Sequence, residues 1–176
     1  MAKNTHDHGA HASAISVIVN DWLVGNGADE TFTGHDGNDF IYSCGGNDVL
    51  NGGAGNDFLW GGMGADTLIG GSGNDKFYFD TWQESVQFDS LGVPTGARDH
   101  IMDFEAGDVI RIGSMFGVDG TRSVSVQQVD ADNFVLTAHF ENASTSWDMT
   151  IDVTGVAPTE AQVIWEPYQG AADVGW

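Results

Sequence analysis

Residues 52–60 read GGAGNDFLW and residues 70–78 read GGSGNDKFY, and these two nine-residue stretches decide the fold. In each, a glycine-rich hexapeptide ends in an aspartate, and an apolar residue follows two places later. That apolar position recurs every nine residues, in Leu23, Phe32, Ile41, Leu50, Leu59, Leu68 and Phe77. The acid recurs with it, as Asp21, Glu30, Asp39, Asp48, Asp57, Asp66 and Asp75. A nine-residue period excludes an amphipathic helix, whose apolar residues recur every three or four positions.

Each unit is predicted to be a turn followed by a short strand. Glycine readily takes positive φ angles, and asparagine tolerates a left-handed conformation better than most residues, so residues 52–57 turn. We expect that conformation at the fifth-place asparagines, which are Asn38, Asn47, Asn56 and Asn74. The next three residues are extended, with Leu59 facing inward. Such short strands need stacking, so two units form one coil of an all-β fold, a right-handed parallel β-roll.

Stacking brings acids of successive coils above one another. Asp39, Asp57 and Asp75 fall on one side of the roll, and Glu30, Asp48 and Asp66 fall on the other. Like charges this close disfavour the ionised state. Carboxylates combined with inward carbonyl groups suit a hard divalent cation, and Ca²⁺, with about six oxygen ligands, fits better than Mg²⁺. The sequence therefore predicts a solenoid that is stabilised by several Ca²⁺ ions.

Three other interpretations fit less well. A flexible glycine-rich linker has no reason to keep an acid and an apolar residue in register through seven periods. A phosphate-binding GxGxxG loop fails because Phe58 follows where a third glycine is needed. An EF-hand starting at Asp36 fails because Asn47 stands where a bidentate glutamate is needed.

The units resemble the G-G-x-G-x-D-x-U-x nonapeptide of RTX (hemolysin-type) calcium-binding proteins. Residues 34–78 match well, and residues 16–33 are degenerate copies. His35 and Cys44 replace the second glycine, and Glu30 replaces an aspartate, so no full-strength site is expected at Glu30. The resemblance implies calcium bound by side chains in the pairs Asp39 with Asp57, Asp57 with Asp75, and Asp48 with Asp66. It also implies backbone contributions from Gly37, Gly46, Gly53, Gly55, Gly62, Gly64, Gly71 and Gly73.

The second half is predicted to be β-rich. Residues 99–112 resemble the D-x-I-x-D-F-x-x-G-x-D-x-I segment that follows the repeats in many RTX proteins, which implies that Asp99 and Asp108 complete the last metal site. Solvated turn acids are the open alternative. Strands at 123–129, 134–140 and 147–153 indicate an antiparallel meander, with a short helix before Val163. We expect a flexible N-terminus at 1–15, a roll at 16–78, and a cap at 79–176. The same resemblance implies an export signal within the cap.

Composition narrows the partners and the compartment. Five basic and 26 acidic residues give a net charge of −21. This charge argues against nucleic acid or an anionic membrane as a binding partner. Cys44 is the single cysteine, so no internal disulfide forms. No cleavable N-terminal signal and no membrane-spanning run is evident. The RTX resemblance implies type I secretion, and extracellular calcium would switch folding on. A cluster of His6, His8 and His11 leaves open a further metal site near the N-terminus.

No catalytic motif is found. The chain has neither H-E-x-x-H nor G-x-S-x-G, and neighbouring acids make Cys44 a poor nucleophile. His100 and His139 are interpreted as structural. The favoured hypothesis is a non-catalytic module that binds a polysaccharide or a protein partner through an outward strip of Tyr42, Asn51, Trp60 and Tyr78. Two alternatives stay open, a small extracellular enzyme with its site in the C-terminal half and a remnant export module of a larger RTX toxin. The oligomeric state also stays open.

Overall fold

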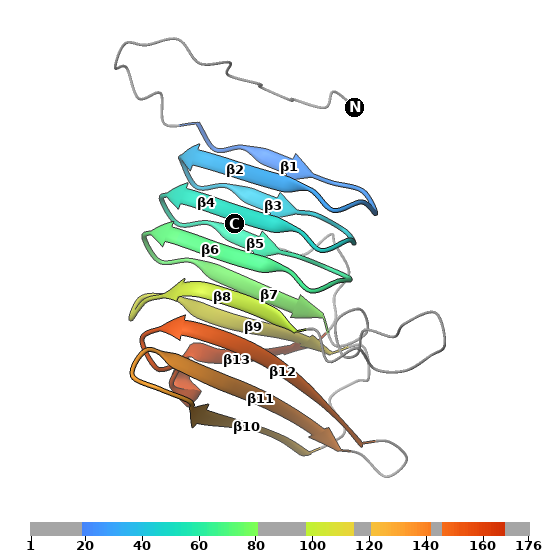
Figure 1. The fold of residues 1–176 in the computed structure, drawn as a ribbon, viewed down its shortest axis with the longest axis vertical. Helices are drawn as coiled ribbons and strands as arrows, with labels where there is room; N and C mark the ends of the chain where they lie inside the picture. The colour runs from blue at the N-terminus through green and yellow to red at the C-terminus, as the bar shows by residue number, and fades with distance from the viewer. Residues whose placement is uncertain (1–18, 81–97, 115–120, 142–145, 168–176) are drawn as a thin grey trace.

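The computed structural model describes residues 19–80, 98–114, 121–141 and 146–167. Within these ranges the chain forms thirteen strands and one short 3-10 helix, η1 (Glu160–Gln162). The strands stack along one long axis, with β1 near one end and β10 at the other (Figure 1). None of the described helical residues forms a segment long and apolar enough to cross a membrane.

The strands form two sheets that lie face to face. Sheet A has the order β1 (Trp22–Val24), β3 (Phe40–Tyr42), β5 (Phe58–Trp60), β7 (Lys76–Asp80), β9 (Val109–Ser114) and β13 (Val163–Pro167). Sheet B has the order β10 (Thr121–Gln128), β11 (Asn133–Glu141), β12 (Ser146–Gly155), β8 (Asp99–Phe104), β6 (Thr67–Ser72), β4 (Val49–Ala54) and β2 (Thr31–Asp36). Odd and even repeats therefore alternate between the sheets, as the nine-residue period predicts.

The register confirms that two repeats make one coil. In sheet A, Leu23 pairs with Ile41, Ile41 with Leu59, and Leu59 with Phe77, all in parallel. In sheet B, Phe32 pairs with Leu50, and Leu50 pairs with Leu68. Each step is two nonapeptides long, so every apolar eighth-place residue lies above its counterpart. The fold is the predicted parallel β-roll.

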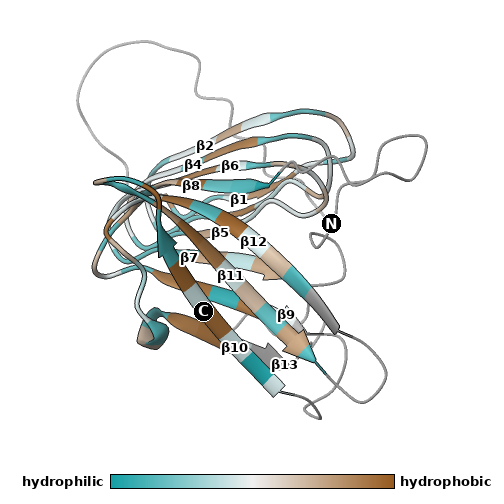
Figure 2. Cartoon of the chain, turned by 60° about the horizontal axis from the view of Figure 1, so that its bottom comes forward, coloured by the Kyte–Doolittle hydropathy of each residue, from teal (hydrophilic) through white to brown (hydrophobic). Residues whose placement is uncertain are grey.

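The second half continues the same two sheets. β8 pairs in parallel with β6, and β9 pairs in parallel with β7, across the segment 81–97 that lies outside the described residues. The predicted meander is present, because β10, β11 and β12 pair in antiparallel fashion. β12 then runs parallel to β8, and β13 runs parallel to β9. Along β11, buried residues alternate with partly buried ones, and Figure 2 shows the strand coloured by hydropathy.

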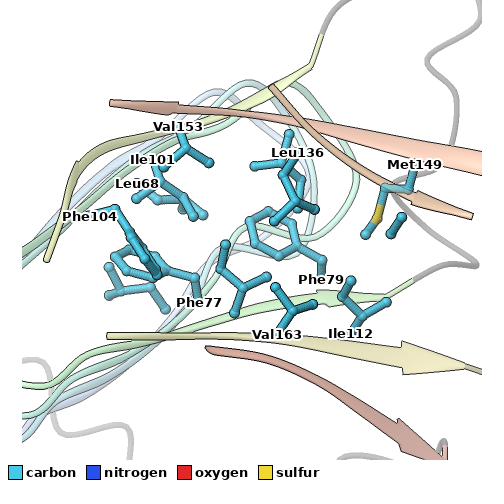
Figure 3. Close-up of a cluster of buried hydrophobic side chains, with 14 of the residues drawn as sticks. Leu68, Phe77, Phe79, Ile101, Phe104, Ile112, Leu136, Met149, Val153 and Val163 are labelled. Carbon is cyan, nitrogen blue, oxygen red and sulfur yellow. The ribbon is translucent and has the colours of Figure 1, made fainter. Parts of the chain in front are cut away.

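One hydrophobic core joins the repeats to the C-terminal strands. Leu68, Ile101 and Val153 from sheet B and Phe77, Ile112 and Val163 from sheet A lie in the same cluster (Figure 3). Phe77 and Phe104 pack with ring centroids 6.2 Å apart. The nine-residue repeat therefore ends at residue 78, where we expected a boundary between roll and cap, but the hydrophobic core continues across this point.

The helix expected before Val163 is the single turn η1. Thr159 and Gln162 form a capping box at this turn. The Gln162 side-chain amide also donates to the carbonyl oxygens of Glu105, Ala106 and Asp108, at 3.3, 3.3 and 3.1 Å. η1 is thereby tied to the turn between β8 and β9.

Candidate metal centre

The repeat acids lie in two columns, one along each edge of the roll. The first acid column consists of Asp21, Asp39, Asp57, Asp75 and Asp108, and the second of Glu30, Asp48, Asp66 and Asp99. Each aspartate after the first acid of its column accepts, through Oδ1, the backbone N–H of the acid one coil before it. Asp57 Oδ1 accepts from Asp39 N at 2.8 Å, and Asp66 Oδ1 accepts from Asp48 N at 2.8 Å. The turns are therefore linked side chain to backbone along the whole stack.

The second carboxylate oxygen of the central acids is buried and has no partner. Each of these residues is 1% exposed, and its Oδ2 atom forms no hydrogen bond; they are Asp39, Asp48, Asp57, Asp66 and Asp75. A Cβ atom added at Gly52 would lie 2.2 Å from Asp57 Oδ2, so this oxygen faces the glycine that opens its own turn. A buried anion without a partner is costly, because desolvation is not offset. Hard oxygen donors in this state fit a divalent cation such as Ca²⁺.

The backbone of the turns is packed too tightly for side chains. A Cβ atom at Gly55 would lie 1.5 Å from the Gly37 carbonyl oxygen, and one at Gly64 would lie 1.6 Å from that of Gly46. All eight glycines predicted as backbone contributors have positive φ angles: Gly37, Gly46, Gly53, Gly55, Gly62, Gly64, Gly71 and Gly73. Carbonyl oxygens of one coil therefore lie against the turn of the next, beside the acid columns.

Burial raises the pKa of the column acids. Desolvation is the largest cause in each case, and the neighbouring acid of the column raises the pKa further. The pKa rises from the ordinary value of 3.8 to about 6 for Asp57, to about 7 for Asp66 and Asp75, and to about 8 for Asp99. Without a cation, Asp66, Asp75 and Asp99 therefore ionise only in part near pH 7.

The ends of the columns differ from their centres. Asp99 and Asp108 are buried, at 6% and 1% exposure, and accept backbone N–H groups from Asp66 and Asp75. They are therefore not solvated turn acids. At the other end, the Glu30 carboxylate accepts from the backbone and side chain of Asn26, both at 2.7 Å. Both oxygens of Glu30 are already engaged there, in agreement with the departure of this repeat from the consensus.

Two features were missed or misread in the sequence. The Asp103 carboxylate accepts from Gly70 N at 2.9 Å and Gly71 N at 2.8 Å, a role that its odd spacing from the repeats conceals. The prediction that the fifth-place asparagines adopt a left-handed conformation is wrong, since His35 and Cys44 are the non-glycine residues with positive φ in the described chain. The asparagines instead form hydrogen bonds between coils. Asn38 Oδ1, for example, accepts from Asn56 N at 2.7 Å.

The nature of the metal ligands follows from what the described residues bring together. No cluster of three or more histidine, cysteine, aspartate or glutamate side chains occurs among them that is suited to a metal ion. A cation in the acid columns would therefore take carboxylates from two coils and complete its shell with backbone oxygens.

Burial raises the pKa of the Cys44 thiol, and the carboxylates of Glu30 and Asp48 raise it further, as expected. His6, His8 and His11 lie outside the described residues.

The outer face of sheet A carries stacked aromatic rings. Trp22 stacks on Phe40 with centroids 4.4 Å apart, and Phe40 stacks on Phe58 at 5.2 Å. The predicted strip is not continuous, because Asn51 lies in β4 of sheet B and Trp60 and Tyr78 are buried. A groove of about 370 Å³ is present instead. Three coils line it with Asn20, Asn38, Asn56, Asp21, Asp39, Asp57, Trp22, Phe40, Phe58 and Lys76.

Comparison with known proteins identifies the repeats. The family model described as the RTX calcium-binding nonapeptide repeat (4 copies) matches residues 19–43 and 45–77. Comparison with curated proteins gives no match. Among solved structures, the AlgE6R2 subunit of the Azotobacter vinelandii mannuronan C5-epimerase is similar at 25% identity and a TM-score of 0.42, over 81% of this chain and 91% of that chain. The AlgE6R3 subunit of the same enzyme is similar at 27% identity and a TM-score of 0.39, over 92% and 86%.

Proposed function

Since the chain carries RTX calcium-binding nonapeptide repeats, we propose that it is a secreted module that folds on extracellular calcium and then binds a polysaccharide. The observation that supports calcium-dependent folding is the set of five buried, unpartnered aspartate oxygens in the acid columns. Bound calcium would neutralise these carboxylates and hold adjacent coils together. The residues that would hold it are the column acids together with the carbonyl groups of the glycine turns.

The chain itself favours an unfolded state until cations are present. Its net charge of −21 opposes compaction, and the buried acids cannot all ionise without a counter-charge. A fold with this requirement suits export of an unfolded chain into a calcium-rich medium. Cys44 is the single cysteine, so no disulfide within the chain joins the coils. We assign that stabilising role to calcium.

The groove on sheet A supports the choice of a polysaccharide. The stacked rings of Trp22, Phe40 and Phe58 line the groove, and Trp22 is 53% exposed. Asn20, Asn38 and Asn56 also line it, one for each coil, and Lys76 follows Phe58 in the strand register. Amide groups match the hydroxyl groups of sugars, and an aromatic ring matches their apolar faces. Repetition with the coil period favours a linear polymer.

The test is retention of the calcium-loaded protein on immobilised alginate, compared with an uncoated matrix. We expect Trp22→Ala to weaken binding by about fivefold, because the exposed ring contributes about 1 kcal/mol of stacking. Val24→Ala is the matched control, since Val24 is equally exposed on the same strand but does not line the groove. Equal retention of both variants would refute the groove as the binding surface, and would leave calcium-dependent folding to be judged separately.

A further inference from the structure

Three polar residues lie in register across the C-terminal meander, far from the acid columns. Ser123 of β10 is directly opposite His139 of β11, and His139 is directly opposite Asp148 of β12. Their neighbours Ala138, Phe140 and Met149 face the core, so all three lie on the outer face of sheet B. The three strands lie side by side at the end of the molecule shown in Figure 2.

The imidazole and the carboxylate of this row are already hydrogen-bonded. His139 Nδ1 lies 2.5 Å from Asp148 Oδ1, and this bond raises the pKa of His139. The partner at Nδ1 fixes the ring orientation and leaves Nε2 as the nitrogen for a substrate or a nucleophile. Glu141 Oε2 lies 3.9 Å from Nε2, and its carboxylate also raises the pKa of His139, after the larger effect of Asp148.

The serine lies on the strand at the edge of sheet B. Val129 N donates to Asn133 O, which makes this the first hydrogen-bonded pair of the β10–β11 hairpin. Hydrogen-bonded and non-hydrogen-bonded residue pairs alternate along an antiparallel ladder. The backbones of Ser123 and His139 therefore also form a hydrogen-bonded pair, and the backbone N–H of Val124 points away from β11. Among the described strands, none pairs with β10 on that side. The backbone N–H after a nucleophile is a common oxyanion donor.

We propose that Ser123, His139 and Asp148 form a serine-nucleophile triad that hydrolyses esters of small carboxylic acids. Ser123 Oγ bonds to the ester carbonyl carbon while its proton passes to His139 Nε2, and the Val124 N–H faces the developing oxyanion. The carbon–oxygen bond to the alcohol then breaks, and the alcohol leaves with the proton from His139. Water repeats the sequence on the acyl-serine, releasing the acid and restoring Ser123. Asp148 positions the imidazole and stabilises its charged form. Ser123 is exposed, so an ester with a small acyl group such as acetyl reaches it directly.

The test is hydrolysis of p-nitrophenyl acetate by the full, calcium-loaded chain, with mass mapping of the acetylated residue. We expect acetyl on Ser123 and a rate at least tenfold above that of Ser123→Ala. His139→Gln should lower the rate to the same level, and the double variant should show no further loss, because the two residues act as a unit. Asp148→Asn should lower the rate with Ser123 still present. Ser125→Ala is the matched control, since Ser125 lies on the same strand face opposite Thr137.

The alternative results overturn the proposal. Acetyl found elsewhere with none on Ser123, or a wild-type rate equal to that of Ser123→Ala, would show that the row is not a nucleophilic site. A full rate in His139→Gln would show that the histidine does not activate the serine. Circular dichroism in calcium verifies that each variant is folded. The groove proposed to bind polysaccharide lies on sheet A, so failure of either proposal leaves the other standing.

Discussion

Cys44 holds a backbone conformation that glycine adopts freely and other residues avoid. Its φ angle is 78°, at the second place of the turn where Gly53, Gly62 and Gly71 stand in later repeats. A left-handed conformation costs about 1–2 kcal/mol for a residue with a Cβ atom, partly offset by the greater unfolded-state freedom of glycine. His35, with φ 77°, has the same constraint. These two turns therefore store strain that the consensus repeat lacks.

We expect Cys44→Gly to be more stable than Cys44→Ala by about 1 kcal/mol, because alanine keeps the strained Cβ while both variants lose the thiol. The measurement is urea unfolding in saturating calcium, followed by circular dichroism. Equal unfolding midpoints for the two variants would show that the turn relaxes around a side chain, and that the strain argument is wrong.

The Asp103 side chain accepts hydrogen bonds from the part of β6 that does not pair with the backbone of β8. β8 pairs with β6 only at Thr67 and Leu68, and the Asp103 carboxylate accepts the N–H groups of Gly70 and Gly71 beyond that point. We expect Asp103→Ala to lower the free energy of unfolding by about 2 kcal/mol, because two backbone donors lose their acceptor. Met102→Ala, on the same strand and exposed, is the control that should change little. Urea unfolding in saturating calcium measures both variants. Similar losses of unfolding free energy in the two would contradict this role of Asp103.

At the scale of elements, the repeats were predictable and their continuation was not. The period of Leu23 to Phe77 predicts alternating strands and two sheets, because one apolar residue per nonapeptide permits only a stacked arrangement. The spacing between column acids jumps from Asp66 to Asp99, so the period alone does not show that β8 and β9 add another coil. The strand pairing between Ser123, His139 and Asp148 is likewise invisible locally, because strand register, and no short motif, brings them together.

The open end of the roll is closed by β10 and β13. Arg122 of β10 lies over the rings of Phe140 and Trp165, with its guanidinium carbon 5.9 and 5.6 Å from their centroids. We expect Arg122→Met to lower the free energy of unfolding by about 1 kcal/mol, since the stem remains and the cation–π contacts are lost. Arg98→Met removes a half-exposed ion pair with Asp152 and should cost less than about 0.5 kcal/mol. Thermal unfolding in calcium compares them, and an equal effect would refute a capping role for Arg122.

For the whole molecule, the raised pKa values of the column acids predict an unusual pH dependence of the metal-free chain. Groups whose pKa is higher in the folded state stabilise it fully below the unfolded value near 3.8, and this contribution is lost as pH rises through about 6 to 8. We therefore expect the chelator-treated protein to have more β signal in far-UV circular dichroism at about pH 5 than at about pH 8. In calcium the order should reverse, because protons compete with the metal for the same oxygens.

A single substitution separates this effect from the general charge of the chain. Asp99→Asn removes the acid with the highest raised pKa, near 8, and should stabilise the metal-free protein at about pH 8. Asp132→Asn removes the same charge from an exposed position and should have a much smaller effect. Circular dichroism of both variants in chelator provides the comparison. Equal effects would mean that net charge, and not burial of the columns, governs the pH dependence.

The central claim is that calcium in the acid columns makes the roll fold. The most direct measurement is a calcium titration of the metal-stripped protein followed by far-UV circular dichroism, with magnesium as the control. The account predicts a cooperative gain of β signal with calcium and none with magnesium at the same concentrations. A chain that is fully folded in chelator at neutral pH, and unchanged by calcium, would contradict it.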